Sequence, residues 1–311
     1  MERLAAIDIG TNSTRLLIGE LLLRGEMQPL ATELRTTRLG KGVDSSQCLQ
    51  PEAIERTIKA LSEYRRLLDD YQVNKFRVVA TSAVRDAVNR QLFIDKVNER
   101  TGLNVEVISG EEEAELSYLG VVKGLSDQLL DSNLVLDIGG GSTEFILGVK
   151  DKIKERFSID VGAVRMTEKS SDIEQRSEMI SSLITPVIKK IDDNLECLLG
   201  VGGTITTLAA IDQSLSSYDP KKVHGYALDI STIKEILLKL NTKSITERKA
   251  VIGLQPKRAD IIVAGIQILL EIMKRMRKKK IIVSESDILE GIIYDYSKKK
   301  KTKVKESNKG I

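Results

Sequence analysis

One short pattern occurs twice in the chain, and it constrains the fold more than any other feature. The two copies lie at residues 4–14 and 134–143. Each copy starts with an apolar run that ends in Asp-Ile-Gly and continues with small residues rich in hydroxyl groups. A second apolar run follows each copy, at residues 15–21 and 144–149. This order predicts a strand, a tight turn and another strand, with an acid at the end of the first strand. Two such hairpins predict two similar domains.

The composition of these turns suits a phosphate group. Glycine permits a sharp turn and the close approach of backbone N–H groups to a ligand. Successive N–H groups form a concave anion site, and hydroxyl groups add further donors. The acid before each turn, Asp8 in the first copy, supplies a hard oxygen for Mg²⁺. The donors are Thr11, Asn12 and Ser13 in the first turn and Gly139, Gly140, Gly141, Ser142 and Thr143 in the second. We expect the two domains to grip a phosphate chain between them.

A third turn has the same chemistry in a different setting. A strand is expected at residues 196–201 and a helix at residues 205–211, and the turn between them consists of Gly202, Gly203 and Thr204. This order places backbone N–H groups at a helix N-terminus, which favours an anion.

The rest of the chain alternates between strands and helices, which predicts an α/β layer fold. The spacing of apolar residues predicts further strands at residues 76–81, 105–108 and 281–283. It predicts further helices at residues 51–71, 89–102, 111–123, 177–194, 231–240, 258–277 and from about residue 287. We place the domains at residues 1–115 with 286–311, and at residues 116–285. The hinge is expected near residues 110–125 and 284–290.

Composition narrows the function classes. A chain of 311 residues is long enough for two domains, and the absence of tryptophan and scarcity of aromatics do not favour single-stranded nucleic acid. No apolar stretch reaches the roughly 18 residues of a membrane span, and the first residues lack the features of a signal peptide. Two distant cysteines, Cys48 and Cys197, do not favour a disulfide. We therefore expect a cytoplasmic protein that does not contact a membrane.

The net charge of +3 comes from the C-terminal end, where residues 298–309 hold seven lysines and one glutamate. The remainder of the chain is net acidic. One interpretation is a solvated, frayed terminus that aids solubility. The other is a tether for polyanions such as polyphosphate or nucleic acid.

Both hairpins resemble the phosphate motifs of the superfamily that contains actin, Hsp70 and sugar kinases, and residues 201–204 resemble its third loop. Within that superfamily the chain is most similar to the exopolyphosphatase and guanosine-pentaphosphate phosphatase (Ppx/GppA) family, in its short two-domain form. Further segments carry this resemblance, at residues 81–87, 108–114, 202–209, 258–265 and 289–291. The resemblance covers about residues 4–296. It implies two actin-like (ribonuclease H-like) domains with the active site in the cleft between them.

The resemblance also implies the activity, which is Mg²⁺-dependent hydrolysis of a terminal phosphoanhydride. The substrate would be polyphosphate, or pppGpp converted to ppGpp; we prefer polyphosphate, because no sequence motif shows a pocket for a base. One alternative is an ATP-dependent kinase or ATPase of the same superfold. Another is non-enzymatic: a sensor that binds (p)ppGpp without hydrolysing it, or a filament-forming relative of actin. The segments at 81–87 and 108–114 favour the phosphatase, and intact Glu113 and Asp137 argue against the sensor. The oligomeric state stays open, a homodimer included.

The acids receive roles through the resemblance. Glu113 matches the glutamate to which catalysis in the family is ascribed, so we expect it to be the general base. Asp137 and Glu144 match acids proposed to hold Mg²⁺ or position water, and Asp8 is a further acid on the metal side. The alternative is structural, because the acids at 111–113 occupy the first turn of a helix, where capping and the helix dipole favour them.

The arginines receive roles in the same way. Arg85 matches an arginine near the scissile phosphate, and Arg15 and Arg258 match arginines implicated in binding guanosine phosphates in short members. The third turn would hold another phosphate group or a nucleotide end. A guanidinium donates two hydrogen bonds at once to a phosphate, but each arginine could equally form a surface ion pair. His224, the only histidine, is expected to be structural.

Overall fold

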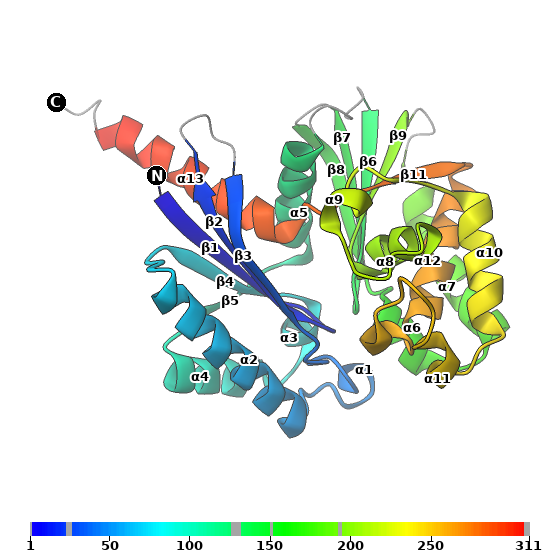
Figure 1. Cartoon of the computed structure of the whole chain (residues 1–311), viewed down its shortest axis with the longest axis horizontal. Coiled ribbons are helices and arrows are strands. Elements are labelled where there is room, and N and C mark those ends of the chain that lie inside the picture. The colour runs from blue at the N-terminus through cyan, green and yellow to red at the C-terminus, as the bar shows by residue number, and fades with distance from the viewer. Residues whose placement is uncertain (1, 23–26, 126–131, 150–151, 192–194, 308–311) are drawn as a thin grey trace.

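The computed structural model describes residues 2–22, 27–125, 132–149, 152–191 and 195–307, with side chains as far as residue 297. Figure 1 shows two lobes, each built on its own β-sheet with helices packed against it. The first sheet has five strands in the order β3-β2-β1-β4-β5, and the second has six in the order β10-β11-β9-β6-β7-β8. In the part of the chain described here, no helix is long and apolar enough to span a bilayer.

The first lobe follows the expected order of elements. Its strands are β1 (Glu2–Ile9), β2 (Thr14–Leu21), β3 (Met27–Arg35), β4 (Phe76–Ala80) and β5 (Val105–Val107). Its helices are α1 (Val43–Ser46), α2 (Pro51–Asp70), α3 (Ser82–Asp86) and α4 (Arg90–Thr101). The apolar stripe of α2, which includes Ile54, Ile58 and Leu61, is buried against the sheet, as its helical spacing predicts.

The second lobe buries both faces of its sheet. Its strands are β6 (Ser132–Ile138), β7 (Thr143–Val149), β8 (Lys152–Ile159), β9 (Cys197–Val201), β10 (Ala227–Asp229) and β11 (Lys280–Val283). One face packs against helices α6 (Ala163–Lys169), α7 (Ile173–Ile188), α8 (Gly203–Asp212), α10 (Ile230–Asn241) and α12 (Ile262–Arg275). The other face packs against α5 (Gly110–Gly124). Short helices α9 (Pro220–Val223) and α11 (Ile245–Arg248) complete the lobe.

The repeated sequence pattern is also a repeat of backbone structure. In both hairpins the first strand pairs with its successor antiparallel and with a later strand parallel: β1 with β2 and β4, and β6 with β7 and β9. The same hydrogen bond closes both turns, from Gly10 N–H to the Ser13 carbonyl and from Gly139 N–H to the Ser142 carbonyl, at 3.0 Å in each. The two hairpin turns are therefore similar in backbone as well as in sequence.

Some helix boundaries differ from the sequence expectations. The helix expected at 177–194 begins at Ile173, because the Asp172 carboxylate accepts the Gln175 N–H at 2.7 Å and caps a longer helix. The helix expected at 258–277 begins at Ile262, since Pro256–Arg258 forms a separate 3-10 turn. Strand β8 and the short helices α3 and α6 were not expected, because their stability comes from packing and not from local periodicity.

The chain crosses between the lobes twice, through α5 and through the segment before α13 (Ile288–Ser307). These two helices pack against each other (Figure 1).

His224 contacts both segments that cross between the lobes. Its Nε2 lies 3.0 Å from the Gly124 carbonyl, and its Nδ1 accepts the Glu285 N–H at 3.1 Å. These two contacts favour a structural role for the histidine. The side chains of the lysine-rich segment 298–309 lie outside the described residues, so its role stays a prediction.

Candidate active site

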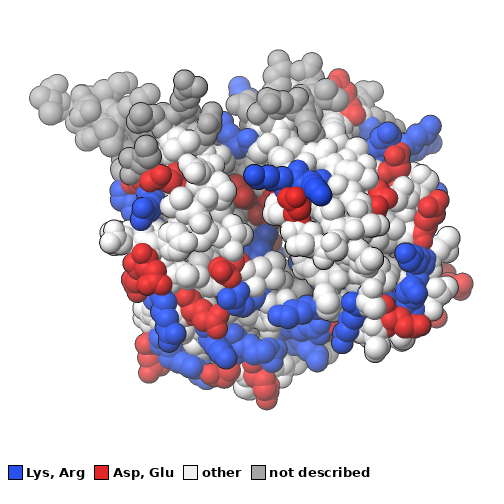
Figure 2. Space-filling model, viewed as in Figure 1, with Lys and Arg blue, Asp and Glu red and all other residues white. Residues whose placement is uncertain are grey.

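The first and second hairpin turns, which we expect to bind phosphate, touch each other between the lobes. A Cβ added to Gly140 would lie 3.0 Å from Thr11 Cβ, and one added to Gly141 would lie 2.9 Å from Thr11 Oγ1. Only glycine leaves room for so close an approach. The space that remains beside Thr11 and Gly141 is about 10 Å³. Figure 2 shows acidic and basic side chains gathered in the hollow between the lobes.

The remaining residues of these two turns are mostly buried. Asn12 donates to Ser13 Oγ at 3.3 Å, and both residues are buried in the first turn. In the second turn the Thr143 hydroxyl donates to the Val161 carbonyl, while Ser142 donates to the Glu144 carboxylate and opposes part of the rise in pKa that burial causes there. The Thr143 hydroxyl is therefore engaged within the protein, whereas Thr11 and Gly141 line the small space between the turns.

Asp8 ends β1 and pairs with Arg15 on β2. Asp8 Oδ2 lies 2.7 Å from Arg15 Nη2, and Arg15 also pairs with Asp287, next to the start of α13. Two carboxylates therefore hold the guanidinium that was expected to bind a guanosine phosphate. The second oxygen of Asp8, Oδ1, is buried without a hydrogen-bond partner among the described residues. Burial raises the pKa of Asp8, although the Arg15 cation opposes the shift.

Glu113 lies in the first turn of α5, directed toward the cleft. Its Oε2 is 3.2 Å from Arg85 Nη1, and Arg85 also donates to the Ile108 carbonyl at 3.1 Å. Burial raises the pKa of Glu113 to about 8; Arg85 opposes this shift and the Asp137 carboxylate adds to it. A carboxyl group with a pKa near neutrality is suited to accept a proton.

The three acids at the start of α5 differ in their surroundings. The cap expected for this helix is formed by Ser109, whose Oγ accepts the Glu112 N–H at 3.1 Å. The Glu112 carboxylate turns to Arg77 instead, at 2.7 Å, and Glu111 is exposed. The side chains of Glu111 and Glu112 therefore lie away from the cleft, one exposed and one paired with Arg77, while Glu113 is the member of the three that lies near the cleft acids.

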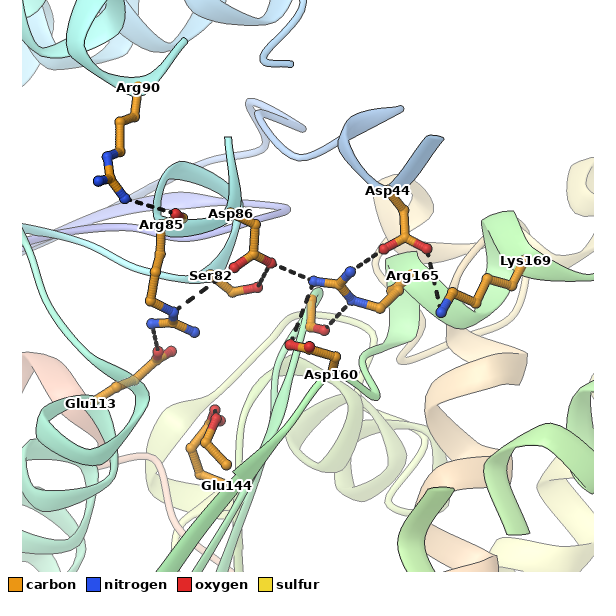
Figure 3. Close-up of polar contacts among 12 residues, drawn as sticks. Asp44, Ser82, Arg85, Asp86, Arg90, Glu113, Glu144, Asp160, Arg165 and Lys169 are labelled. Atoms are coloured by element: carbon orange, nitrogen blue, oxygen red, sulfur yellow. Dashed lines mark hydrogen bonds and ion pairs between the residues drawn. The ribbon is translucent and has the colours of Figure 1, made fainter. Parts of the chain in front are cut away.

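Asp137 and Glu144 face each other across β6 and β7. Asp137 Oδ2 accepts the Ser117 hydroxyl at 2.8 Å, and Glu144 Oε1 accepts the Ser158 hydroxyl at 2.8 Å. Burial, followed by the charge of Asp287, raises the pKa of Asp137 to about 6. Burial, followed by the charge of Glu113, raises the pKa of Glu144 well above its ordinary value. Figure 3 shows Glu144 close to the pair of Glu113 and Arg85.

Asp8, Glu113, Asp137 and Glu144 form one electrostatic unit, which we call the carboxylate cluster. Repulsion among its members contributes to their raised pKa values. No group of three or more acidic, histidine or cysteine side chains in the described part of the chain is arranged closely enough to hold a metal by itself. The donors are nevertheless hard oxygens, and the unpartnered Oδ1 of Asp8 lies among them. They fit Mg²⁺, which binds through one or two carboxylates together with water and phosphate oxygens.

The third turn lies beside this cluster. Gly202 has φ = 91°, which favours glycine, and a Cβ there would lie 3.1 Å from Asp137 Oδ1. The Arg258 guanidinium covers Gly203 at the start of α8, and Thr204 is buried next to Gly265. Burial, followed by the Arg15 charge, lowers the pKa of Arg258 to about 10. Among the described ion pairs none involves Arg258, which leaves a cation available for an anionic ligand.

Three supporting residues were missed at the sequence level. Ser117 lies four residues after Glu113 on the same helix face, so helical spacing was a usable signal for it. Ser158 reaches Glu144 from the neighbouring strand, and Asp287 reaches Arg15 across 272 residues of sequence. No local pattern indicates those two contacts.

These features define a class of protein: an α/β protein of two lobes, with paired glycine-rich hairpin turns and a group of acids between the lobes. The model of the Ppx/GppA phosphatase family matches residues 18–300. The chain therefore belongs to the Ppx/GppA phosphatase family. This confirms the family expected from the motifs and the fold of two actin-like domains.

Named relatives agree with this assignment. The chain is 36% identical over 313 residues to a Mycobacterium tuberculosis protein named exopolyphosphatase 2, and the match covers 94% of this chain and 98% of the relative. It is 38% identical to a bifunctional 3-dehydroquinate synthase/phosphatase of Fusobacterium nucleatum, but there it spans only 46% of the relative's length. The crystal structure of the Aquifex aeolicus Ppx/GppA family member has a TM-score of 0.81 at 34% identity, covering 96% of this chain and 98% of that one.

Proposed function

We propose that this protein hydrolyses the terminal phosphoanhydride of inorganic polyphosphate and releases orthophosphate, with Glu113 as the general base. One observation carries the proposal. A largely buried glutamate, Glu113, with a side chain 12% exposed and a pKa of about 8, lies beside Arg85, in the cleft where two phosphate turns meet. The Mycobacterium tuberculosis relative, matched over almost its full length, carries the name of that activity.

We assign binding of the polyphosphate end to the first and second turns. The first two turns present backbone N–H groups and the hydroxyls of Thr11 and Ser13 to successive phosphates of the chain end. Arg85 would neutralise charge on the terminal phosphoryl group, since phosphoryl transfer depends mainly on positioning and charge stabilisation.

Asp8, Asp137 and Glu144 are the residues that would hold Mg²⁺. When bound, the ion neutralises phosphate oxygens and templates the reacting groups. Ser117 and Ser158 orient two of these carboxylates, Asp137 and Glu144, through their 2.8 Å hydrogen bonds.

The chemical step needs one proton acceptor. A water oxygen attacks the terminal phosphorus, and the Glu113 carboxylate accepts a proton from that water as the new O–P bond forms. The bridging P–O bond breaks, and its electron pair leaves with the shortened chain. The products are orthophosphate and a chain shorter by one phosphate.

A second candidate substrate is pppGpp, which also ends in a phosphoanhydride. Arg258 favours this candidate, because its guanidinium covers the third turn and pairs with no carboxylate among the described residues. Such a cation could hold the second phosphate group of a guanosine nucleotide. A sensor without turnover and an ATP-dependent enzyme are the remaining alternatives.

One experiment separates these functions: phosphate release with Mg²⁺ from long-chain polyphosphate, pppGpp and ATP, measured on a single preparation. Release from polyphosphate alone supports the proposal. Release from pppGpp, with ppGpp as product, supports the second candidate. Release from ATP alone would indicate the ATP-dependent alternative. Tight binding of ppGpp without release from any of the three would indicate a sensor.

A further inference from the structure

Helix α6 carries an arginine that connects the second phosphate turn to the opposite lobe. Arg165 Nε donates to the Gly141 carbonyl at 2.7 Å. One terminal nitrogen pairs with Asp44 in α1, and the other lies 2.6 Å from Asp86 in α3. A single guanidinium therefore uses three different nitrogens to join a phosphate turn to two helices of the first lobe (Figure 3). The side chain is only 12% exposed.

The start of α6 also orients the peptide groups of that turn. The N–H of Ala163 donates to the Gly139 carbonyl at 2.9 Å, and the N–H of Val164 donates to the Gly140 carbonyl at 2.8 Å. With the Arg165 bond, three successive carbonyls of the turn face α6. In a trans peptide the N–H points opposite to the carbonyl. The following N–H groups, the last of which belongs to Ser142, therefore point away from α6.

Arg165 also connects to the candidate base through ion pairs. Asp86, which it binds, lies 4.0 Å from Arg85 Nε, and Arg85 pairs with Glu113 at 3.2 Å. The series runs from Glu113 through Arg85, Asp86 and Arg165 to Asp44, with alternating charge. Figure 3 shows that it spans both lobes.

Neighbours of Arg165 on α6 contact the same region of the first lobe. Lys169 Nζ lies 3.5 Å from Asp44 Oδ2, and the Glu168 carboxylate accepts the Gly42 N–H at 3.1 Å. Three side chains of α6, those of Arg165, Glu168 and Lys169, therefore contact α1 or the residue before it.

We propose that Arg165 is a positioning residue: it holds the two lobes together over the second phosphate turn and fixes Arg85 relative to Glu113. This inference rests on the proposed hydrolase function. It assigns Arg165 no contact with the substrate, because all three of its donor positions are occupied by protein oxygens. Opening of the lobes would then accompany substrate entry and product release.

The test uses four single variants of the full chain, together with the double variant of Arg165→Gln and Asp44→Asn. Arg165→Gln removes the positive charge and the planar guanidinium group. Arg165→Lys keeps the positive charge but not the guanidinium group. Asp44→Asn removes the charge of an ion-pair partner that lies in the other lobe. Arg156→Gln is the matched control, because Arg156 forms an exposed pair with Glu115 outside this series. Circular dichroism and thermal unfolding establish that each variant is folded. Small-angle scattering without substrate reports the separation of the lobes, and steady-state kinetics report kcat and KM.

We expect Arg165→Gln to increase the radius of gyration and to lower kcat about 10-fold or more, since misplacement by about 1 Å costs up to about 100-fold. Arg165→Lys should not restore kcat, because an ammonium group cannot replace three directional bonds. Asp44→Asn should show the same defect more weakly, and the double variant should be no worse than Arg165→Gln alone. Arg156→Gln should behave as the wild type.

Two results would overturn the inference. One is a scattering profile and kcat for Arg165→Gln that match the wild type. The other is a loss of substrate affinity in Arg165→Gln with no effect of Asp44→Asn, which would make Arg165 a substrate ligand. A wild-type protein that releases no phosphate from any substrate would instead remove the proposed function, while the scattering comparison would still test the connection between the lobes.

Discussion

The Arg15 guanidinium lies 2.7 Å from the Asp8 carboxylate across the first hairpin. The matching place in the second hairpin is occupied by Glu144, which faces Asp137. The two hairpins share their backbone but differ in charge: an ion pair in the first and two carboxylates in the second. This difference explains why the second hairpin contributes more acids to the carboxylate cluster.

Replacing Arg15 with alanine should destabilise the fold. The change leaves Asp8 and Asp287 buried without their cation; removing one partner of a fully buried ion pair costs about 3–5 kcal/mol, and we expect a loss toward the lower end because Arg15 is 25% exposed. Denaturant unfolding measures the loss. The matched control is Arg100→Ala, which breaks an exposed pair with Glu55 and should cost at most about 1 kcal/mol. Equal, small losses in both variants would show that the Arg15 pairs contribute little to stability.

The same Arg15→Ala variant tests the role of this arginine in substrate choice. We expect it to weaken binding of guanosine phosphates more than it slows hydrolysis of long polyphosphate. Calorimetric titration with ppGpp and phosphate release from polyphosphate measure the two effects, at a temperature where the variant is folded. An equal effect on both would contradict this division of roles.

Asp8 should contribute to binding of Mg²⁺. Its Oδ1 is buried without a partner, so a bound cation would satisfy it and reduce repulsion in the carboxylate cluster. We expect millimolar Mg²⁺ to raise the melting temperature of the wild type and to have a much smaller effect on Asp8→Asn. Asp172→Asn, which keeps the cap of α7 outside the cleft, should respond as the wild type does. An unchanged response in Asp8→Asn would place the ion elsewhere.

Stability should fall as pH rises through the titration of Glu113. Its pKa is about 8 in the folded protein and 4.5 ordinarily, so between these values the folded state holds a proton that the unfolded state has lost. The stabilisation is complete below pH 4.5 and is lost as pH approaches 8. Asp137, with a pKa of about 6, adds to the same slope. Without Mg²⁺, the free energy of unfolding should therefore be lower at about pH 8 than at about pH 5.5, measured by denaturant unfolding.

Glu113→Gln should reduce this slope, because the amide does not titrate. The activity of the wild type should change in the opposite direction, rising toward pH 8 as the base loses its proton. A pH–stability slope in Glu113→Gln equal to that of the wild type would show that other groups are responsible.

Much of the fold could be predicted from sequence. The hairpins were evident because the apolar runs and glycine turns are local signals, and α2 was evident because its apolar residues repeat at helical spacing. Helix α6 was not predicted, since it has seven residues and is held by contacts to the second turn. Short elements of this kind depend on tertiary packing, which local patterns do not record.

The candidate site was predictable in its parts but not in its connections. The glycine turns and the acid before each turn could be recognised from their residue types alone. The pairing of Arg15 with Asp287 joins residues 272 positions apart, so a position expected to bind substrate is also part of an internal ion pair. Arg165 likewise acquires its neighbours only when the lobes come together.

The most direct test of the account is phosphate release from long-chain polyphosphate by the wild type, Glu113→Gln and Glu111→Gln, with Mg²⁺ and with substrate binding measured in parallel. Glu111 lies in the same helical turn but is exposed, which makes it the matched control. We predict at least a ~100-fold loss of turnover in Glu113→Gln with substrate binding nearly unchanged, as expected when a general base is removed, and wild-type turnover in Glu111→Gln. A folded Glu113→Gln variant that turns over polyphosphate at close to the wild-type rate would contradict the assignment of Glu113 as the base.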